Sequence, residues 1–283
     1  MRTGGIIRII VGLVIAVLLT AFLVAALTGF NLFEKLGWNT GWTSWLHGNS
    51  ISTVDDGSTV VSETAAVDAA GVGEIKIDWV AGSVEIRAGE GDQITFYETA
   101  NRTLTDAQKM RYTLSSTGVL QIKYSADVED IFDWLDSDTY NMPAKALIVT
   151  VPASMIGTLE TLEIDAVSAK VDVDGVYGGE TKITTVSGAI IAANIACEEL
   201  KLSSTSGSVK AEACQTEKLD LGNVSGSLRA EGVYTQIDAE SVSGEVRLSC
   251  SSAPDKITAE SVSGSVTVQL PESAGFTAKL DSV

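Results

Sequence analysis

The chain has 283 residues, of which 45% are hydrophobic, and a formal net charge of −18 at pH 7. This acidic balance argues against nucleic acid or another polyanion as a partner. The single histidine, His47, and the lack of a phosphate loop, a dinucleotide motif or a nucleophile elbow predict neither an enzyme nor a bound cofactor or metal.

The first 30 residues predict a membrane anchor. Residues 6–30 are almost unbroken apolar, which is long enough for a helix to cross about 30 Å of hydrocarbon. Arg2 and Arg8 lie at its start and acidic residues dominate after it, so the N-terminus is expected in the cytoplasm and the rest outside. A cleaved signal peptide is the alternative, but the run exceeds the usual apolar length of about 7–15 residues. We therefore predict that residues 1–30 form a single-pass transmembrane signal anchor.

Residues 31–72 are predicted to connect this anchor to a folded domain. Trp38, Trp42 and Trp45 have the spacing of one face of a short helix, which is typical of a membrane-interface belt. A stripe that binds a partner is the alternative. From about residue 48 the composition shifts to Ser, Thr, Asp, Ala and Gly, which indicates a flexible tether.

Residues 73–152 show alternating apolar and polar residues, the period of a half-buried strand. The segment 75–86 alternates on both sides of a turn at Ala81-Gly82, and further strands are expected at residues 93–97, 111–114, 120–124 and 147–151. We interpret this part as the irregular beginning of the repeat array described below.

An acidic insert at residues 126–142 departs from this pattern. Its six acids are interleaved with four large apolar residues, which we single out as a possible docking set: Ile131, Phe132, Trp134 and Leu135. The insert is expected to cover the N-terminal end of the array, because such an end needs protection. A docking segment for a partner and a weak Ca²⁺ site are the alternatives.

Residues 153–283 carry a repeated phrase, Val-Ser-Gly or a close variant, whose third residues are spaced 19, 19, 19, 18 and 20 apart. Short alternating runs precede and follow each phrase. A fixed period of about 20 residues is the signature of a stacked repeat. Because glycine adopts a positive φ without strain, we assign the corners to the glycines of the phrase and of its early copy, with a ligand-cradling role as the alternative. They are Gly82, Gly188, Gly207, Gly226, Gly244 and Gly264.

The predicted fold is therefore all-β: a parallel β-solenoid of about 19 residues per coil with two main sheets, preceded by one transmembrane helix. Residues 276–283 begin another copy of the phrase and stop before its Ser-Gly. We expect either a truncated chain or an open C-terminal rung that another chain covers. Cys197, Cys214 and Cys250 fall at different phases of the repeat, so no disulfide is expected.

Several of these features together resemble a known family. They are the phrase at residues 77–86, Gly91-Asp92, Leu147-x-Val149-x-Val151-Pro152 and the Val-Ser-Gly ladder. Over about residues 73–283 the chain is similar to the bacterial β-strand-repeat family called "putative adhesin", a domain of unknown function. The resemblance implies a parallel β-solenoid at a bacterial surface, sometimes encoded with envelope-stress systems, and it supplies no catalytic residues.

We expect a non-enzymatic, membrane-anchored solenoid outside the cytoplasm that acts as a cell-envelope scaffold or envelope-stress accessory. Its expected partners are the membrane, through the N-terminal helix, and envelope or membrane proteins. One alternative is a surface adhesin for host or cell-surface ligands. Another is end-to-end self-assembly through the C-terminal rung.

Overall fold

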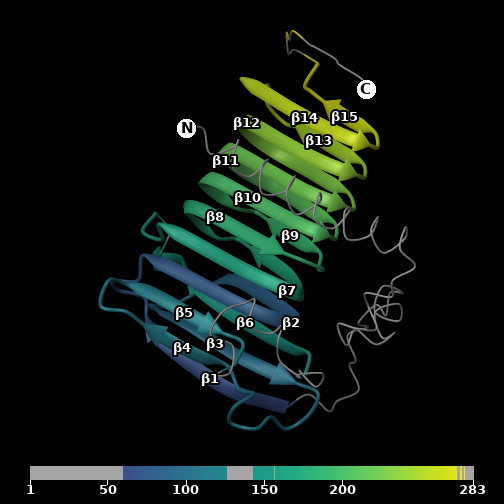
Figure 1. Ribbon diagram of the computed structural model, residues 1–283. Coiled ribbons are helices and arrows are strands. Elements are labelled where there is room, and N and C mark those ends of the chain that lie inside the picture. The colour runs from purple at the N-terminus through teal and green to yellow at the C-terminus, as the bar shows by residue number, and fades with distance from the viewer. Residues whose placement is uncertain (1–59, 126–142, 156, 273–274, 276, 278–283) are drawn as a thin grey trace, which may run out of the picture. The chain divides into compact units, whose positions relative to one another are not determined.

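The computed structural model describes residues 60–125, 143–155, 157–272, 275 and 277. These residues belong to one compact unit and are almost entirely β-structure (Figure 1). The predicted anchor (1–30), the three interfacial tryptophans and the acidic insert (126–142) lie outside the described residues. Within the described part of the chain, no helix has the length and apolar character needed to cross a bilayer.

The strands follow in chain order, with one 3-10 helix, η2 (Ala153–Met155), after β6. They are β1 (Val60–Asp68), β2 (Glu74–Gly89), β3 (Gln93–Ala100), β4 (Arg111–Leu114), β5 (Val119–Lys123), β6 (Lys145–Pro152), β7 (Thr161–Asp174), β8 (Tyr177–Thr185), β9 (Ile190–Ala193), β10 (Ala196–Ser206), β11 (Val209–Ser225), β12 (Leu228–Ser243), β13 (Val246–Cys250), β14 (Lys256–Ser263) and β15 (Val266–Gln269).

The strands form coils with two faces, which we call A and B. Face A consists of β4, β5, β8, β10, β14 and the parts of the long strands at residues 74–79, 161–166, 215–225 and 234–243. Face B consists of β1, β3, β6, β9, β13, β15 and residues 82–89, 169–174, 209–212 and 228–232. β2 and β7 run through one corner from face A to face B, and β11 and β12 run through the opposite corner from face B to face A, so both faces belong to one hydrogen-bonded array.

Successive coils stack in parallel with one repeat between partners. Leu200 pairs with Leu219, Leu219 with Ile237, and Ile237 with Ile257. The predicted parallel β-solenoid with coils of about 19 residues is therefore confirmed, and Figure 1 shows the coils rising in order from β7 to β15.

The core lies between the two faces and follows the alternation of the sequence. In β2, Ile75, Ile77 and Trp79 point inward from face A, and Val84 and Ile86 point inward from face B, all fully buried. Small and branched side chains continue these ladders through each coil, so every coil buries its apolar residues only by stacking on its neighbours.

The N-terminal end is built from antiparallel strands. On face B, β3 pairs with β6 and β1 with β3; on face A, β4 pairs with β5. The prediction of a flexible tether up to residue 72 is wrong for β1, which occupies residues 60–68. The inward residues of β1, Ala65 and Val67, are small and lie in a polar composition, which hid the alternation.

Candidate functional site

The six predicted corner glycines all lie where the chain passes from face A to face B, and each meets the coil before it. A Cβ at Gly188, Gly207, Gly226, Gly244 or Gly264 would overlap the carbonyl oxygen of the preceding corner, and one at Gly82 would overlap the backbone of Lys145. Of the six, only Gly82 and Gly226 have a positive φ. The predicted reason, a left-handed backbone, is therefore wrong for the other four, whose requirement is close approach between coils.

A polar ladder lies just inside the last five of these corners, three residues before each glycine, and sequence analysis missed it. Its members are Thr185, Ser204, Asn223 and Ser241, which are buried, and Ser261, which is half-buried. Ser204 Oγ donates to Gly188 O at 3.2 Å, and Ser261 Oγ donates to Gly244 O at 3.3 Å. These hydroxyls, rather than the serine beside the glycine, bind the carbonyls of the preceding corner. The fixed spacing of the ladder was the available signal.

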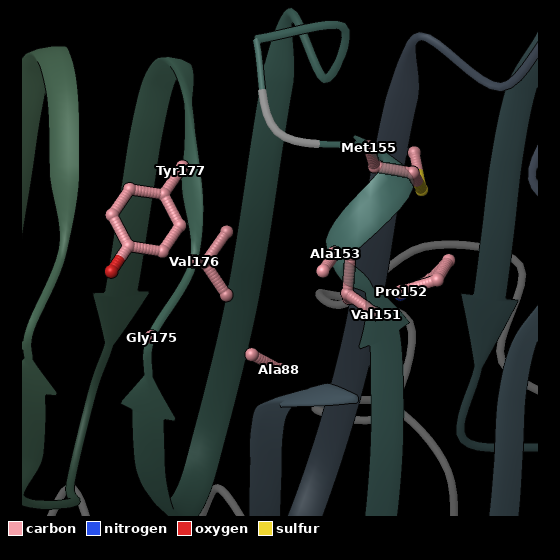
Figure 2. A pocket seen from close by; sticks show the side chains of 8 residues that line it. All are labelled: Ala88, Val151, Pro152, Ala153, Met155, Gly175, Val176 and Tyr177. Atoms are coloured by element: carbon pink, nitrogen blue, oxygen red, sulfur yellow. The ribbon is translucent and has the colours of Figure 1, made fainter. Parts of the chain in front are cut away.

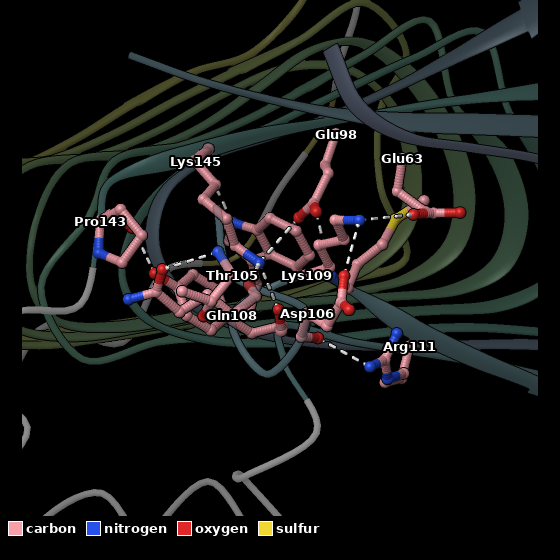
Figure 3. Close-up of polar contacts among 12 residues, drawn as sticks. Glu63, Glu98, Thr105, Asp106, Gln108, Lys109, Arg111, Pro143 and Lys145 are labelled. Atoms are coloured by element: carbon pink, nitrogen blue, oxygen red, sulfur yellow. Dashed lines mark hydrogen bonds and ion pairs between the residues drawn. The ribbon is translucent and has the colours of Figure 1, made fainter. Parts of the chain in front are cut away.

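The first coil contains a buried cluster around Lys145, drawn in Figure 3. Its ammonium lies 2.7 Å from Glu98 Oε2, and both side chains are fully buried. Lys145 Nζ also donates to Gln108 O at 2.7 Å and to Tyr124 O. The ammonium lies 3.9 Å from the ring centre of Tyr124, a cation–π contact. Two backbone carbonyl oxygens and the Glu98 carboxylate thus surround the ammonium.

Further contacts of this cluster join elements that are distant in sequence. Glu98 Oε1 accepts a hydrogen bond from the backbone N–H of Met110 at 3.0 Å. Trp79 Nε1 donates to Lys145 O at 3.3 Å, and the Tyr124 hydroxyl donates to Pro143 O. The cluster thus connects β2, β3, β6, the end of β5 and the segment between β3 and β4.

Burial controls the ionisation of the cluster. It lowers the pKa of Lys145 to about 8, against the opposing effect of Glu98, and it raises the pKa of Tyr124. A lysine with a lowered pKa can serve as a nucleophile or base. Here the side chain has no exposed surface, so no substrate can reach it, and the cluster is a structural connection.

The sequence did carry a signal for this pair. Glu98 occupies an inward phase of β3, after Ile94 and Phe96, and Lys145 occupies an inward phase of β6, before Leu147. Opposite charges at inward positions of two neighbouring strands predict a buried ion pair, because an unpaired charge there is costly.

The outer surface of face A carries a network of alternating lysine and glutamate side chains. Lys182 Nζ lies 2.5 Å from Glu163, which also lies 3.6 Å from Lys76. Lys201 lies 2.6 Å from Glu180 and 2.9 Å from Glu199. The hydrogen bond from Lys182 lowers the pKa of Glu163 and raises that of Lys182 itself. The network spans β2, β7, β8 and β10 and gives this face a regular pattern of charge.

Two hollows are too small or too open to enclose a small molecule. Figure 2 shows an apolar cavity of about 30 Å³ beside η2, lined by Val151, Met155 and Val176 among others. Enclosed ligand sites have volumes of about 300–1,000 Å³. An open hollow of about 510 Å³ is lined by Gly178, Gly179 and four glutamates, of which Glu180 and Glu199 already pair with Lys201. Across the described ranges, no group of acidic, cysteine or histidine side chains could hold a metal ion.

Two predicted sets cannot be placed. Ile131, Phe132, Trp134 and Leu135 lie outside the described residues, as do Trp38, Trp42 and Trp45. The three cysteines are free: Cys214 and Cys250 are buried in the core and Cys197 is half-buried.

Comparison with known proteins gives one family. A family model described as Toastrack DUF4097 matches residues 72–283. No curated protein matches the chain significantly.

Similar solved structures have low identity. One is a "putative adhesin" from Bacteroides fragilis, with 12% identity, 74% of this chain and 97% of that chain covered, and a TM-score of 0.46. Another is a "putative cell adhesion protein" from Clostridium sporogenes, with 13% identity, coverage of 74% and 98%, and a TM-score of 0.35. A third is a "putative lipid binding protein" from Parabacteroides distasonis, with 15% identity, coverage of 75% and 97%, and a TM-score of 0.35.

Proposed function

Because the chain belongs to the Toastrack DUF4097 family, we propose that it is a non-enzymatic scaffold at the cell envelope that presents the outer faces of its solenoid to protein partners. The observation that carries this proposal is the charged network on face A, which extends over neighbouring coils at a regular spacing. A rigid row of paired charges offers a partner both register and selectivity, since like charges placed opposite it are repelled.

The rest of the described surface is consistent with this role. The apolar cavity beside η2 is far below the size of an enclosed ligand site, and the buried lysine and glutamate of the first coil have no exposed surface. A protein partner, in contrast, needs no cavity, because it binds an extended surface.

We further propose that residues 1–30 anchor the protein in the membrane with the solenoid outside the cytoplasm. The support is the sequence: an apolar run at residues 6–30, two arginines near its start and three tryptophans after it. The test is labelling of intact cells with a membrane-impermeant maleimide. A cysteine introduced on face A by Ser203→Cys should be labelled before lysis, and one introduced by Thr3→Cys only after lysis. The reverse pattern would contradict this topology.

The scaffold role is tested by photo-crosslinking in cells that express the full chain. A photoreactive residue replaces Thr184 on face A in one variant and Lys170 on face B in another, followed by mass spectrometry of the products. We expect the Thr184 variant to capture one or a few membrane or envelope proteins and the Lys170 variant to capture them less. Equal capture from both positions, or no captured protein, would contradict a specific face. In the second case a surface adhesin with ligands outside the cell becomes the better explanation.

A second candidate function is end-to-end assembly through the rung formed by β14 and β15. Val266 and Val268 occupy inward phases of β15 but are 41% and 40% exposed. If this rung associates, the mass from light scattering should grow steadily with concentration, and Val268→Glu should abolish the growth. A mass that does not change with concentration would reject this assembly.

A further inference from the structure

The N-terminal end of the solenoid is stepped. Beyond β2, face B continues through three strands, β6, β3 and β1, whereas face A continues through two, β5 and β4. Face B therefore extends one strand further than face A. In the described ranges, β1 and β4 each have one edge without a strand partner, and Figure 1 shows them outermost at this end.

Among the described residues, the core is open at this step. Tyr112 and Leu114 of β4 pair with Ile122 and Leu120, so they share the inward phase, yet they are 44% and 47% exposed. The Tyr112 ring reaches across to Phe96 of face B, with ring centres 5.0 Å apart. On the other side, Ala65 and Val67 of β1 pack on the core but stay half-exposed. The end thus presents apolar side chains from both faces next to two unpaired strand edges.

The directions of the two edge strands are the same. β4 runs antiparallel to β5 on face A, and β1 runs parallel to β6 on face B, because each of the pairs β1–β3 and β3–β6 is antiparallel. The coil strands of faces A and B run in opposite directions, since the chain turns back at the corner. It follows that β1 and β4 point the same way.

We propose that a second copy of this chain occupies this end, with β1 of each copy paired in parallel with β4 of the other. A two-fold axis parallel to the strands, passing between the two faces, places face A of one copy in line with face B of its partner. The one-strand step is then self-complementary: the longer face B of each copy fills the space beyond the shorter face A of the other. Such an isologous interface makes both pairings at once.

Charge favours this pairing over the others. β1 contains Glu63 and Asp68 and no base, whereas β4 contains Arg111 and no acid. Two copies of β1 side by side would place only negative charge together, and pairing β1 with β4 avoids this repulsion. The inward residues Tyr112 and Leu114 would be covered by the partner's β1, extending the core across the junction. This inference goes beyond the proposed scaffold role and does not depend on it.

Cysteine crosslinking of the full-length protein in membranes tests the arrangement. Ala66 of β1 and Thr113 of β4 lie between inward residues, so they point out of opposite faces of one molecule, and a short bismaleimide cannot join them within it. The double variant Ala66→Cys/Thr113→Cys should give a crosslinked dimer. Each single variant should give no more crosslinked dimer than the parent, because the proposed arrangement keeps the two copies of β1 apart and the two copies of β4 apart. The parent controls for the native cysteines. Single variants that crosslink as well as the double variant, or a double variant that does not crosslink, would overturn the proposal.

A mass measurement provides an independent test. Light scattering of the full chain in mild detergent should give a dimer for the parent and a monomer for Leu114→Glu, because the charge would enter the shared core. Val186→Glu is the matched control, since Val186 is 49% exposed at a corner far along the solenoid, and it should remain a dimer. If Leu114→Glu leaves the mass unchanged, or the parent is monomeric, the proposed interface is wrong.

Discussion

Lys145 and Glu98 form an ion pair of 2.7 Å in which neither side chain has exposed surface, although 46 positions separate them along the chain. Removing one partner leaves a charge buried without compensation. We predict that Lys145→Met lowers the free energy of unfolding by about 3–5 kcal/mol, and that Lys145→Met/Glu98→Met loses less than Lys145→Met alone. Urea denaturation of the three proteins measures both values. A double variant less stable than Lys145→Met would show that the pair itself, and not the orphaned charge, dominates.

The corner glycines predict a sharp contrast in stability between alanine substitutions at two glycines of one coil. Gly207→Ala would push a Cβ into the carbonyl of Gly188, so we expect a loss of about 1–3 kcal/mol or more. Gly222→Ala is the control, because its Cβ would make only ordinary contact with Ser203 on face A. Thermal unfolding followed by circular dichroism compares the two. Equal melting temperatures would mean that the coils can separate at the corner at little cost.

The polar ladder predicts that Asn223 can be replaced by serine without loss of stability. The side-chain amide of Asn223 is buried and has no hydrogen-bond partner in the described structure, whereas Ser204 one coil earlier donates to Gly188 O. Asn223→Ser should therefore be as stable as the parent or more stable by up to about 1 kcal/mol, because the hydroxyl can donate to the preceding corner. Ser204→Ala, which removes such a bond, should be less stable than the parent. A clear loss of stability in Asn223→Ser would instead indicate that the volume of the amide matters more.

The ion pairs of the face A network predict that the free energy of unfolding depends on pH in the acidic range. Lys182 holds the pKa of Glu163 below its ordinary value of 4.5, so the folded carboxyl binds its proton at lower pH than the unfolded one. The stabilisation from this pair is complete above about pH 4.5 and is lost as the pH falls through the lowered pKa. For a partly exposed pair we expect less than about 1 kcal/mol. The difference in unfolding free energy between the parent and Glu163→Gln should therefore be present at pH 7 and shrink towards pH 3; a difference that grows in acid would refute the assignment.

Sequence periodicity predicted the coils well because every coil must bury alternate residues and turn at the same place. The alternation of Leu219 and Leu221 and the spacing of the Val-Ser-Gly phrases determine which residues face inward and where the chain turns. At each corner glycine a neighbouring coil comes close, a contact that the sequence of a single coil does not reveal. Val224, the apolar residue of one phrase, is only half-buried, and its neighbour Asn223 faces the interior.

The N-terminal end was harder to predict because it is not repetitive. The antiparallel pairings of β1 with β3 and of β3 with β6 join distant segments, which no local pattern specifies. The roles of Glu98 and Lys145 likewise depend on contacts between strands far apart in sequence. The residues of the proposed interfaces lie mostly at this irregular end or on the outer faces. On the outer faces, alternation predicts only that a side chain is exposed.

The corner stack has a consequence for how such a protein can change in evolution. Each corner contacts only the corners directly before and after it, and the ladder that pairs Val209 with Leu228 continues in the same way from Leu228 to Val246. Duplicating or deleting one complete coil, such as residues 208–226, would leave every remaining neighbour contact in place and alter the length by about 4.8 Å. The length of the solenoid can thus change one coil at a time by gene duplication, independently of its two ends and of the side chains on either face.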